Sequence, residues 1–492
     1  MEAVSATESH QPASRGGGIV CGTRPARLFE MLPGSDLPLF KGRAAGAVGD
    51  DIWYYAPGYL SLVPPDRSEA FEADLLSASA SDIHAIELRR HAAEAEAKWA
   101  ARQTAPFAPV CLTVYPSNRC NSACGYCYSA ASRSGASPKI GIPTVRSAAD
   151  LVAANCLARF LPLTVVLHGG GEPTLDRRLA DGILDATEAA ASRRGLGLFR
   201  YVATNGILSA GKAFWLVRRF DLIGLSCDGP DWIQDRQRPL PGGRRGSPMV
   251  ESTAHIVREA GKPLHVRVTI TPASVAHQSE IAEYICSRLR PSEIHVEPFY
   301  AMGKVSPQAC GRFVASQAEE YVAGFLDARA VAQRYGVEWS SSQVRPDEVH
   351  GPYCEVFRDV LHVVPGGAAT GCFGVVDSAH AREVGMDIGG PPAGRGEFVI
   401  DVVQVRDLRR TLDLRSPACD ECFNRYHCAR GCPEVCPAER SEPAVTFRCR
   451  VEQMLAYAYL SQTAHGLLAC TARRGEILGG PVTAHVRPGA RS

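Results

Sequence analysis

Short apolar runs alternate with longer helical patterns through the middle of the chain. Six runs have the length of β-strands, and they cover residues 110–115, 163–168, 199–203, 222–226, 265–271 and 293–297. Helical patterns separate and follow them, at residues 144–161, 177–194, 210–219, 248–260, 278–289 and 312–335. Strands that alternate with helices predict right-handed crossovers and a parallel sheet. We therefore expect an α/β fold built as a partial (β/α)6 TIM-like barrel, with its chemistry at the carboxyl ends of the strands.

The segments on either side of this barrel have other patterns. Residues 1–36 are rich in Gly, Ser and Ala and predict a disordered leader. A β-hairpin around a Pro-Gly turn is predicted at residues 51–63, with helices at 68–76 and 82–102. Beyond residue 337 the periodicity fades while Gly, Pro and Cys increase, until an apolar helix at 452–468 and a basic tail at 482–492.

These patterns divide the chain into five parts. We assign residues 1–36 to the leader, 37–106 to an α+β N-terminal extension, 107–336 to the barrel, 337–462 to a small Cys-rich module and 463–492 to a C-terminal tail. The barrel is the part in which strand and helix patterns alternate most regularly, so we look for the functional residues first at its strand ends.

Composition narrows the class of protein. The chain has 492 residues, of which 45% are hydrophobic and 21% charged, as in ordinary globular proteins. Its net charge of +1 gives no electrostatic reason to expect a nucleic acid or an anionic membrane as a partner. We find neither an apolar run of about 18 residues, as a membrane helix needs, nor an apolar signal segment near residue 1. We therefore expect a cytoplasmic protein.

Cysteines are the most informative residues. The chain has 18 of them, with three inside residues 120–127 and six inside 419–449. Because disulfides are rare in the cytoplasm, such clusters indicate metal ligation. Cys120, Cys124 and Cys127 follow the first predicted strand with C-x3-C-x2-C spacing, so three thiolates can converge from one loop on a metal cluster. Three ligands leave one iron of a four-iron cluster open, whereas a zinc site with a fourth ligand from elsewhere is the alternative.

With Tyr126 between its last two cysteines and Tyr128 after them, this loop resembles the cluster loop of the radical S-adenosylmethionine (radical SAM) superfamily. The resemblance implies a 4Fe–4S cluster whose open iron chelates the amine and carboxylate of SAM. Reduction then cleaves SAM to a 5′-deoxyadenosyl radical. The resemblance also implies that Tyr126 contacts the cofactor and that a donor such as flavodoxin or ferredoxin supplies the electron.

Two strand ends carry further matches to this superfamily. Gly170, Gly171 and Glu172 precede a proline and match its GGEP motif, whose residues hold the amine of SAM. Glycines let the backbone approach a ligand closely, and a carboxylate accepts hydrogen bonds from an ammonium group. Asn205 lies in a Thr-Asn-Gly segment at the end of the third predicted strand, which matches a short motif near SAM.

The fourth strand and the segment after it match two more motifs. Ser226 and Asp228 fit SxDGP, in which Ser226 would contact the SAM carboxylate or ribose, and Asp228 would bind the cofactor or only shape the loop. Arg238 fits DxxRP, in which the guanidinium pairs with the SAM carboxylate, a bidentate contact that suits its fork of donors. Arg267 and Glu297 on later strands are candidate groups at the barrel mouth, with structural roles as the alternative.

The C-terminal cysteines point to one class within this superfamily. They match the seven-cysteine pattern of the SPASM domain, an accessory module that holds auxiliary iron–sulfur clusters, at Cys354, Cys372, Cys419, Cys422, Cys428, Cys432 and Cys449. A zinc ribbon is the alternative, because CxxC pairs with later cysteines also suit tetrahedral zinc. The whole resemblance covers residues 110–449.

By this resemblance the seven cysteines serve up to two clusters. One cluster takes Cys419, Cys422, Cys428 and Cys449, and the other takes Cys354, Cys372 and Cys432. The second cluster lacks a fourth cysteine at the position that some relatives use, where this chain has Glu348. The candidates for this ligand are Cys436, Cys310, His350 and a substrate atom, or the iron stays open.

The resemblance implies an enzyme that abstracts a hydrogen atom from a peptide or protein side chain. Our first hypothesis is a maturase that installs a thioether or carbon–carbon cross-link in a ribosomally synthesised precursor peptide. The hairpin and helices of the N-terminal extension weakly resemble winged-helix elements that bind leader peptides. An extension that only packs over the open end of the barrel explains them equally well.

Two other hypotheses stay open. An anaerobic sulfatase maturase would oxidise a Cys or Ser to formylglycine, but those enzymes usually carry an Asp directly after the second module cysteine, where this chain has Phe373. A non-catalytic iron–sulfur or zinc scaffold would predict decay of the GGEP, SxDGP and DxxRP motifs, and all three are intact. We assign no catalytic residue from the sequence.

Overall fold

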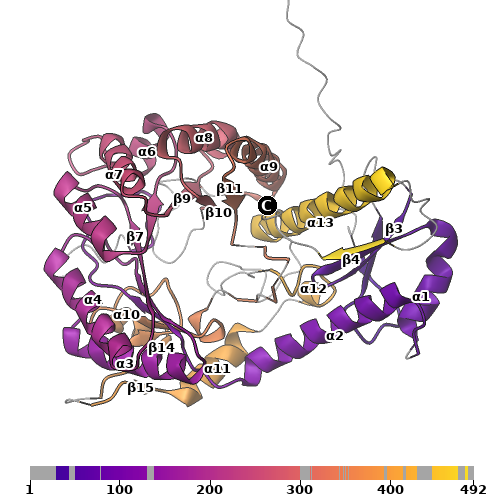
Figure 1. Ribbon diagram of the computed structural model, residues 1–492, viewed down its shortest axis with the longest axis horizontal. Coiled ribbons are helices and arrows are strands. Elements are labelled where there is room, and N and C mark those ends of the chain that lie inside the picture. The colour runs from indigo at the N-terminus through magenta and orange to yellow at the C-terminus, as the bar shows by residue number, and fades with distance from the viewer. Residues whose placement is uncertain are drawn as a thin grey trace, which may run out of the picture.

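A computed structural model of the chain contains two β-sheets and the helices that surround them (Figure 1). The residues that it describes are 29–43, 50–77, 79–129, 138–299, 311, 313–342, 344–346, 348–349, 351–352, 354–392, 396–413, 417–428, 446–474 and 482–485. Within these ranges no helix is both long enough and apolar enough to cross a membrane.

Six consecutive parallel strands form the wall of the barrel. They are β5 (Cys111–Val114), β6 (Leu163–Leu167), β7 (Leu198–Thr204), β8 (Leu222–Ser226), β9 (Leu264–Ile270) and β10 (Glu293–Pro298), each paired with the next. A further parallel strand, β11 (Glu338–Ser340), follows β10 in the sheet. The six predicted strands and the predicted α/β partial barrel are therefore confirmed.

Helices cover the outside of the barrel (Figure 1). They are α3 (Ile142–Ala158), α4 (Arg177–Ser192), α5 (Ala210–Arg219), α6 (Asp231–Gln237), α7 (Ser247–Glu259), α8 (Gln278–Tyr284) and α9 (Ala318–Arg334). The helix predicted at 278–289 changes after α8 into a π-helical turn, η4 (Ile285–Leu289). The sequence pattern did not predict α6, because seven residues are too few to show a helical period.

The barrel strands bury one face and expose the other to the lumen. In β9 the even-numbered residues 264–270 are apolar and buried, whereas His265, Arg267 and Thr269 are partly exposed. β10 repeats this alternation with partly exposed Glu293, His295 and Glu297. A parallel sheet that is packed on both faces is normally apolar throughout. The polar inner face therefore indicates a lumen that accommodates a polar ligand.

The Cys-rich module continues the barrel sheet beyond its first strand. β12 (Val360–Val363) pairs in parallel with β5, and β13 (Ala369–Thr370), β14 (Asp387–Gly390) and β15 (Val399–Ile400) follow as antiparallel strands. The helices of this region are α10 (Ser378–Glu383), α11 (Val402–Leu412), α12 (Pro417–Asp420) and α13 (Phe447–Arg474). The module therefore shares one continuous sheet with the barrel.

A second, antiparallel sheet makes up the N-terminal extension. It contains β1 (Phe29–Met31), β2 (Phe40–Arg43), β3 (Ile52–Ala56), β4 (Tyr59–Val63) and, from the far end of the chain, β16 (Val482–His485). α1 (Ser68–Leu76) and α2 (Ile83–Thr104) follow the predicted hairpin at the predicted places. β1 lies inside the stretch predicted as a leader, and β16 lies inside the predicted basic tail.

Aromatic side chains join this extension to the Cys-rich module. Trp53 stacks on Tyr457 of α13 with 5.9 Å between ring centroids. Trp99 of α2 meets Tyr426 edge-on at 5.6 Å. α2 and α13 both run along the N-terminal sheet toward the barrel (Figure 1). Short helical turns complete the fold, at η1 (Pro65–Arg67), η3 (Val275–His277), η5 (Ala315–Gln317) and η6 (Glu355–Phe357).

Candidate functional site

The cysteine loop leaves the barrel after β5, at the carboxyl ends of the parallel strands. Each of its thiols faces a polar side chain: Ser122 Oγ lies 3.3 Å from Cys124 Sγ, Ser129 Oγ 3.2 Å from Cys127 Sγ, and Asn205 Nδ2 3.7 Å from Cys120 Sγ. Burial raises the pKa of the Cys124 thiol, and the nearby positive charge of Arg238 partly offsets this effect. Hydrogen bonds from polar groups to the ligating sulfur atoms help to set the reduction potential of an iron–sulfur cluster.

The glycine turn after β6 packs directly on the cysteine loop. Glu172 N donates a hydrogen bond to the carbonyl oxygen of Arg119 over 2.8 Å. A Cβ atom added at Gly171 would lie 2.1 Å from that same oxygen, and Gly170 has a φ of +73°. Only glycine allows this approach and this backbone conformation without strain. The GGEP-like segment therefore positions the cysteine loop by backbone contact.

The carboxylate of Glu172 is buried and is fully engaged by the protein. Thr174 donates to it from both N (3.0 Å) and Oγ1 (2.6 Å), Thr204 Oγ1 donates over 2.9 Å, and Asn205 N donates over 2.7 Å. Burial raises the pKa of Glu172, and these hydrogen bonds counteract the effect. Glu172 thus ties the ends of β6 and β7 together, while its predicted contact with SAM stays a prediction.

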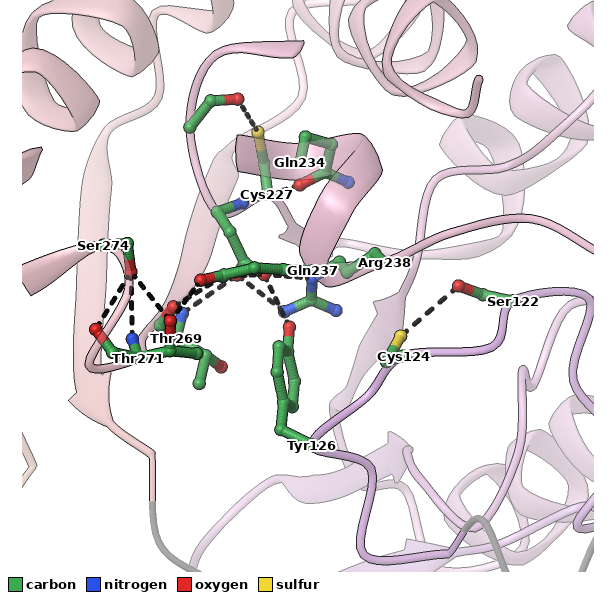
Figure 2. Close-up of polar contacts among 12 residues, drawn as sticks. Ser122, Cys124, Tyr126, Cys227, Gln234, Gln237, Arg238, Thr269, Thr271 and Ser274 are labelled. Atoms are coloured by element: carbon green, nitrogen blue, oxygen red, sulfur yellow. Dashed lines mark hydrogen bonds and ion pairs between the residues drawn. The ribbon is translucent and has the colours of Figure 1, made fainter. Parts of the chain in front are cut away.

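Asp228 is the hub of a buried polar network that joins the cysteine loop to β9. Figure 2 shows its partners Tyr126, Gln237, Arg238 and Thr269 lying close together. Its carboxylate accepts hydrogen bonds from Tyr126 Oη (2.6 Å), Gln237 Nε2 (2.8 Å), Thr269 N (3.0 Å) and two nitrogens of Arg238 (3.0 Å each). Asp228 is fully buried. Of the two roles left open by the sequence, shaping the loop is the one that this geometry supports.

Arg238 is held by Asp228 but keeps donors available. Nε and Nη2 bind the carboxylate, and the guanidinium lies 5.3 Å from the ring centroid of Tyr126. Burial disfavours its charge, but the carboxylate of Asp228 outweighs burial and keeps the pKa well above the usual value. Nη1 donates to none of the described residues. The predicted pairing with a ligand carboxylate therefore has a donor left to make it.

Inner-face side chains line the lumen beneath these loops. Ser226 lies beside Arg267 in the β8–β9 register, and both are partly exposed. Glu297 accepts a hydrogen bond from Ser342 N over 2.9 Å. Burial, reinforced by the charge of Arg267, lowers the pKa of His168 to about 3, so this imidazole is neutral at pH 7. The two candidate barrel-mouth groups, Arg267 and Glu297, do face the lumen.

The cysteines predicted for one auxiliary cluster lie in neighbouring turns. Cys422 N donates to the carbonyl oxygen of Cys419 over 3.3 Å. The thiol of Cys428 donates to the carboxylate of Glu452, and Cys449 precedes that residue by one turn of α13. Burial, together with the negative charge of Glu452, raises the pKa of Cys428.

The second predicted set is described only in part. Cys354 is buried, and the thiol of Cys372 lies 3.3 Å from Gly374 N. Glu348, at the position of the missing ligand, binds Arg345 over 2.6 Å. The remaining candidates lie outside the described residues, namely Cys432, Cys436, Cys310 and His350.

The side chains around the described cysteines fit iron–sulfur ligation in their chemistry. Gln453 Nε2 lies 3.6 Å from Cys422 Sγ, so an amide donor faces this thiol. The thiols of Cys124 and Cys127 in the barrel loop face hydroxyl groups instead. Among the residues that the structure describes, no three His, Cys, Asp or Glu side chains are placed to hold a single metal ion. The ligand sets therefore stay predictions from the cysteine pattern.

Sequence reasoning missed a group of rings at the carboxyl end of the first barrel strand. Tyr115 Oη lies 3.0 Å from Tyr128 Oη and donates to the carbonyl oxygen of Phe373 over 2.6 Å. The imidazole of His362 on β12 packs edge-on against Tyr115 at 4.1 Å and is fully buried. Neither ring nitrogen of His362 has a hydrogen-bond partner in the described part of the chain. His362 reaches Tyr115 because β12 pairs with β5. β12 has only four residues, which are too few for a sequence pattern to predict that pairing.

Comparison with known proteins adds the fold family. No family model and no curated protein sequence matches this chain. The structure of anSMEcpe with bound AdoMet matches with a TM-score of 0.58 and 17% sequence identity, over 73% of this chain and 100% of that one. This chain has the fold of anSMEcpe. The resemblance inferred from the motifs is thereby confirmed at the level of the fold.

Two further matches are similar in extent. The complex of anSMEcpe with AdoMet and the Cp18Cys peptide gives a TM-score of 0.57 at 16% identity, over 73% of this chain and 99% of that one. SuiB of Streptococcus suis with bound S-adenosylmethionine gives 0.46 at 15% identity, over 74% of this chain and 83% of that one. Because anSMEcpe is matched over its full length, the additional residues of this chain are extensions of that fold.

Proposed function

We propose that this protein is a radical SAM enzyme that modifies a peptide, either at a side chain or by installing a thioether or carbon–carbon cross-link. One observation carries the proposal. The Cys120–Cys127 loop is held at the carboxyl ends of the barrel strands by the segments that match SAM-binding motifs, through the Gly171 contact and through Asp228. A non-catalytic scaffold would not require the cysteine loop and the SAM-binding motifs to lie together at the mouth of a polar lumen.

The residues divide the work of such an enzyme. Cys120, Cys124 and Cys127 would hold the 4Fe–4S cluster, and Ser226 and Arg238 would bind the SAM carboxylate. The cofactors would supply the 5′-deoxyadenosyl radical when bound, with an electron from a donor such as flavodoxin or ferredoxin. The protein would orient the substrate and exclude water, and the neutral His168 would add no further positive charge to that of Arg267. The C-terminal cysteines would hold up to two auxiliary clusters.

Anaerobic reconstitution with iron and sulfide, followed by metal counting and a SAM-cleavage assay under reductant, tests this proposal. We expect about eight to twelve irons per chain and formation of 5′-deoxyadenosine. A triple variant with Cys120, Cys124 and Cys127 changed to Ala should lose about four irons and all cleavage. The matched control is Cys286→Ala, which changes a buried cysteine in η4 that belongs to none of the motifs. Zinc in place of iron, without SAM cleavage, would leave the scaffold hypothesis.

A second candidate is formylglycine formation, supported by the fold of anSMEcpe and its crystal complex with the Cp18Cys peptide. This chain differs where those enzymes carry their Asp, because Phe373 follows Cys372 and its carbonyl accepts the hydroxyl of Tyr115. The two activities are separated by mass spectrometry of a cysteine-containing peptide after turnover. Formylglycine replaces the thiol by an aldehyde oxygen, whereas a cross-link keeps the sulfur and removes two hydrogen atoms.

A further inference from the structure

A cavity rich in arginine lies on the outside of the barrel, away from the strand ends that carry the motifs. α7 and α8 belong to the outer layer of helices (Figure 1), and η4, which continues α8, packs on α7. Between α7 and η4 is a surface cavity of about 310 Å³, which we call the arginine cavity. It is lined by Glu251, His255, Arg258, Ser287, Arg288 and Arg290. α7 and η4 end just before β9 and β10 begin, so the arginine cavity lies toward the amino ends of the strands.

Two of its arginines have no acidic partner. Arg288 and Arg290 are exposed, and neither guanidinium forms an ion pair within the described part of the chain. The Arg290 side chain makes one weak internal hydrogen bond, from Nε to the carbonyl oxygen of Ser287 over 3.4 Å. Their remaining donors are therefore available to a ligand.

The other lining residues leave the arginine cavity positively charged. Arg258 Nη2 lies 2.8 Å from His255 Nδ1 and donates to Glu259 over 3.3 Å. Glu251, the one acid of the lining, accepts the hydroxyl of Tyr284 over 2.5 Å. Three guanidinium groups and one carboxylate give the lining a formal charge of +2, or +1 when Glu259 beside it is included. A ligand for this cavity is therefore an anion.

An unusual backbone brings neighbouring side chains of η4 to this cavity. In a regular α-helix, residues one or two apart do not face each other, yet Ser287, Arg288 and Arg290 line the same cavity. The chain forms a π-helical turn here, and Arg290 follows it in the left-handed conformation, with φ 51° and ψ 57°. Glycine is the usual residue at such a position, because a Cβ atom is unfavourable there. Both π-helical turns and left-handed residues other than glycine recur at functional sites.

We propose that the arginine cavity binds the phosphate group of a small molecule, with Arg288 and Arg290 as its main donors. A phosphate group has three acceptor oxygens and a charge of about −1.5 to −2 at pH 7, which complements the charge of the lining. The planar fork of a guanidinium group matches phosphate oxygens in geometry. Glu251 is placed to accept a hydroxyl group from the rest of the molecule. This site lies outside the radical chemistry and does not depend on the proposed function.

Isothermal titration calorimetry of the full-length, reconstituted protein at low ionic strength tests this proposal. The probes are inorganic phosphate and ribose 5-phosphate, and ribose is the control that lacks the phosphate group. We expect at least one phosphate probe to bind with a Kd of about 1 mM or tighter, and ribose not to bind. Tighter binding of ribose 5-phosphate supports a phosphate ester as the ligand, whereas equal binding of both probes supports free phosphate. Absence of binding by both phosphate probes overturns the proposal.

Two variants locate the bound phosphate. Arg288→Ala removes one guanidinium group, and Arg290→Gly removes the other and places glycine in the left-handed position. Each should weaken binding at least about tenfold, because a charge-assisted hydrogen bond is lost. The matched control is Arg218→Ala, which removes an exposed arginine from the last turn of α5. Binding that is unchanged in both cavity variants, or weakened equally in the control, places the anion elsewhere and overturns the proposal.

Thermal unfolding separates a lost contact from a damaged fold. Arg290→Gly should unfold at the same temperature as the wild type or at a higher one, because glycine adopts the left-handed conformation without strain. Weaker binding by this variant, at undiminished stability, supports direct contact between Arg290 and the phosphate. A phosphate probe that raises the unfolding temperature of Arg290→Gly as much as that of the wild type contradicts it. SAM cleavage by both cavity variants should equal that of the wild type, so failure of the radical chemistry and failure of this site are separate results.

Discussion

The barrel loop and the C-terminal module both bury cysteines, but different parts of the chain hold them there. Around the barrel loop the support is polar and contiguous, because Asp228 joins Tyr126, Arg238 and β9 within the barrel itself. Around the module, polar contacts from Glu452 and Gln453 are joined by aromatic packing that comes from the N-terminal extension. Trp99 packs on Tyr426, whose hydroxyl donates to a glutamate 330 residues earlier in the chain.

This difference separates the requirements of the two sites. A buried ion pair is costly to break, but it fixes the position of each partner through directed hydrogen bonds. Aromatic packing contributes more through area than through direction. The barrel site should therefore fail when one polar group is removed, whereas the module should fail when a large side chain from outside it is removed. The extension is then part of the scaffold of the module.

Removal of the Asp228 carboxylate should have the largest effect. Asp228→Ala leaves Arg238 buried without its counter-ion, and loss of one partner of such a pair costs about 3–5 kcal/mol. Urea unfolding of the iron-free protein should show this loss, and reconstituted protein should lack the barrel-loop cluster. Asp221→Ala is the control, since Asp221 pairs with Arg200 over 3.1 Å at the partly exposed end of the barrel. Its cost should stay below about 1 kcal/mol, and a similar loss in both variants would contradict the assignment of Asp228 as the hub.

The next largest effect should come from the extension. Trp99→Ala removes a buried ring that faces Tyr426, and Trp-to-Ala changes in cores cost about 3–5 kcal/mol. We expect reconstituted protein to lose about one auxiliary cluster while the barrel-loop cluster is retained. Iron counting with electron paramagnetic resonance separates the two. Trp232→Ala is the control, because that side chain is 44% exposed. If Trp99→Ala lost the barrel-loop cluster before an auxiliary cluster, the N-terminal extension would support the barrel site rather than the module.

Much of the barrel was predictable because its elements are long enough to show a period. The six apolar runs identified the strands, and the motifs at the strand ends identified the cysteine loop and the segments around it. The role of Asp228 was not decidable in this way. Its partners include the backbone N of Thr269, 41 residues later in the chain. Every residue except proline has a backbone N–H, so a sequence motif cannot indicate which one donates to Asp228.

The extension was less predictable, for a related reason. β1, β12 and β16 have only three or four residues each, so no pattern distinguishes them from loops. One signal was present in β3, where all five residues are apolar or aromatic and all are buried. A strand that is buried on both faces must be covered on both sides. That pattern implied a partner for the hairpin beyond α1 and α2, which the structure supplies as α13.

A smaller effect is expected where the glycine turn meets the cysteine loop. Gly171→Ala places a Cβ 2.1 Å from the backbone oxygen of Arg119, so one of the two loops must move. Overpacking of this kind costs about 1–3 kcal/mol, and the affinity for SAM, measured by calorimetry on reconstituted protein, should fall. Gly211→Ala in the first turn of α5 is the control, since no atom lies within 4 Å of the added group. Gly211→Ala should be neutral or slightly stabilising. If Gly171→Ala had the same effect, close packing of the glycine turn on the cysteine loop would not be what requires glycine at position 171.

The smallest effect should appear only in acid, at the seam between the two regions. His362 lies on β12, which joins the module to β5, and burial, with a further contribution from His168, lowers its pKa to about 3. Below about pH 6.5 the unfolded chain binds a proton that the folded chain refuses until about pH 3, so stability falls as the pH drops through this window. At pH 5 this costs about 2 kcal/mol at most. Urea unfolding at pH 7 and pH 5 should therefore show a smaller acid loss in His362→Leu and in His362→Asn, neither of which titrates. An acid loss equal to that of the wild type in both variants would mean that His362 accepts its proton in the folded state, and that the seam is open to water.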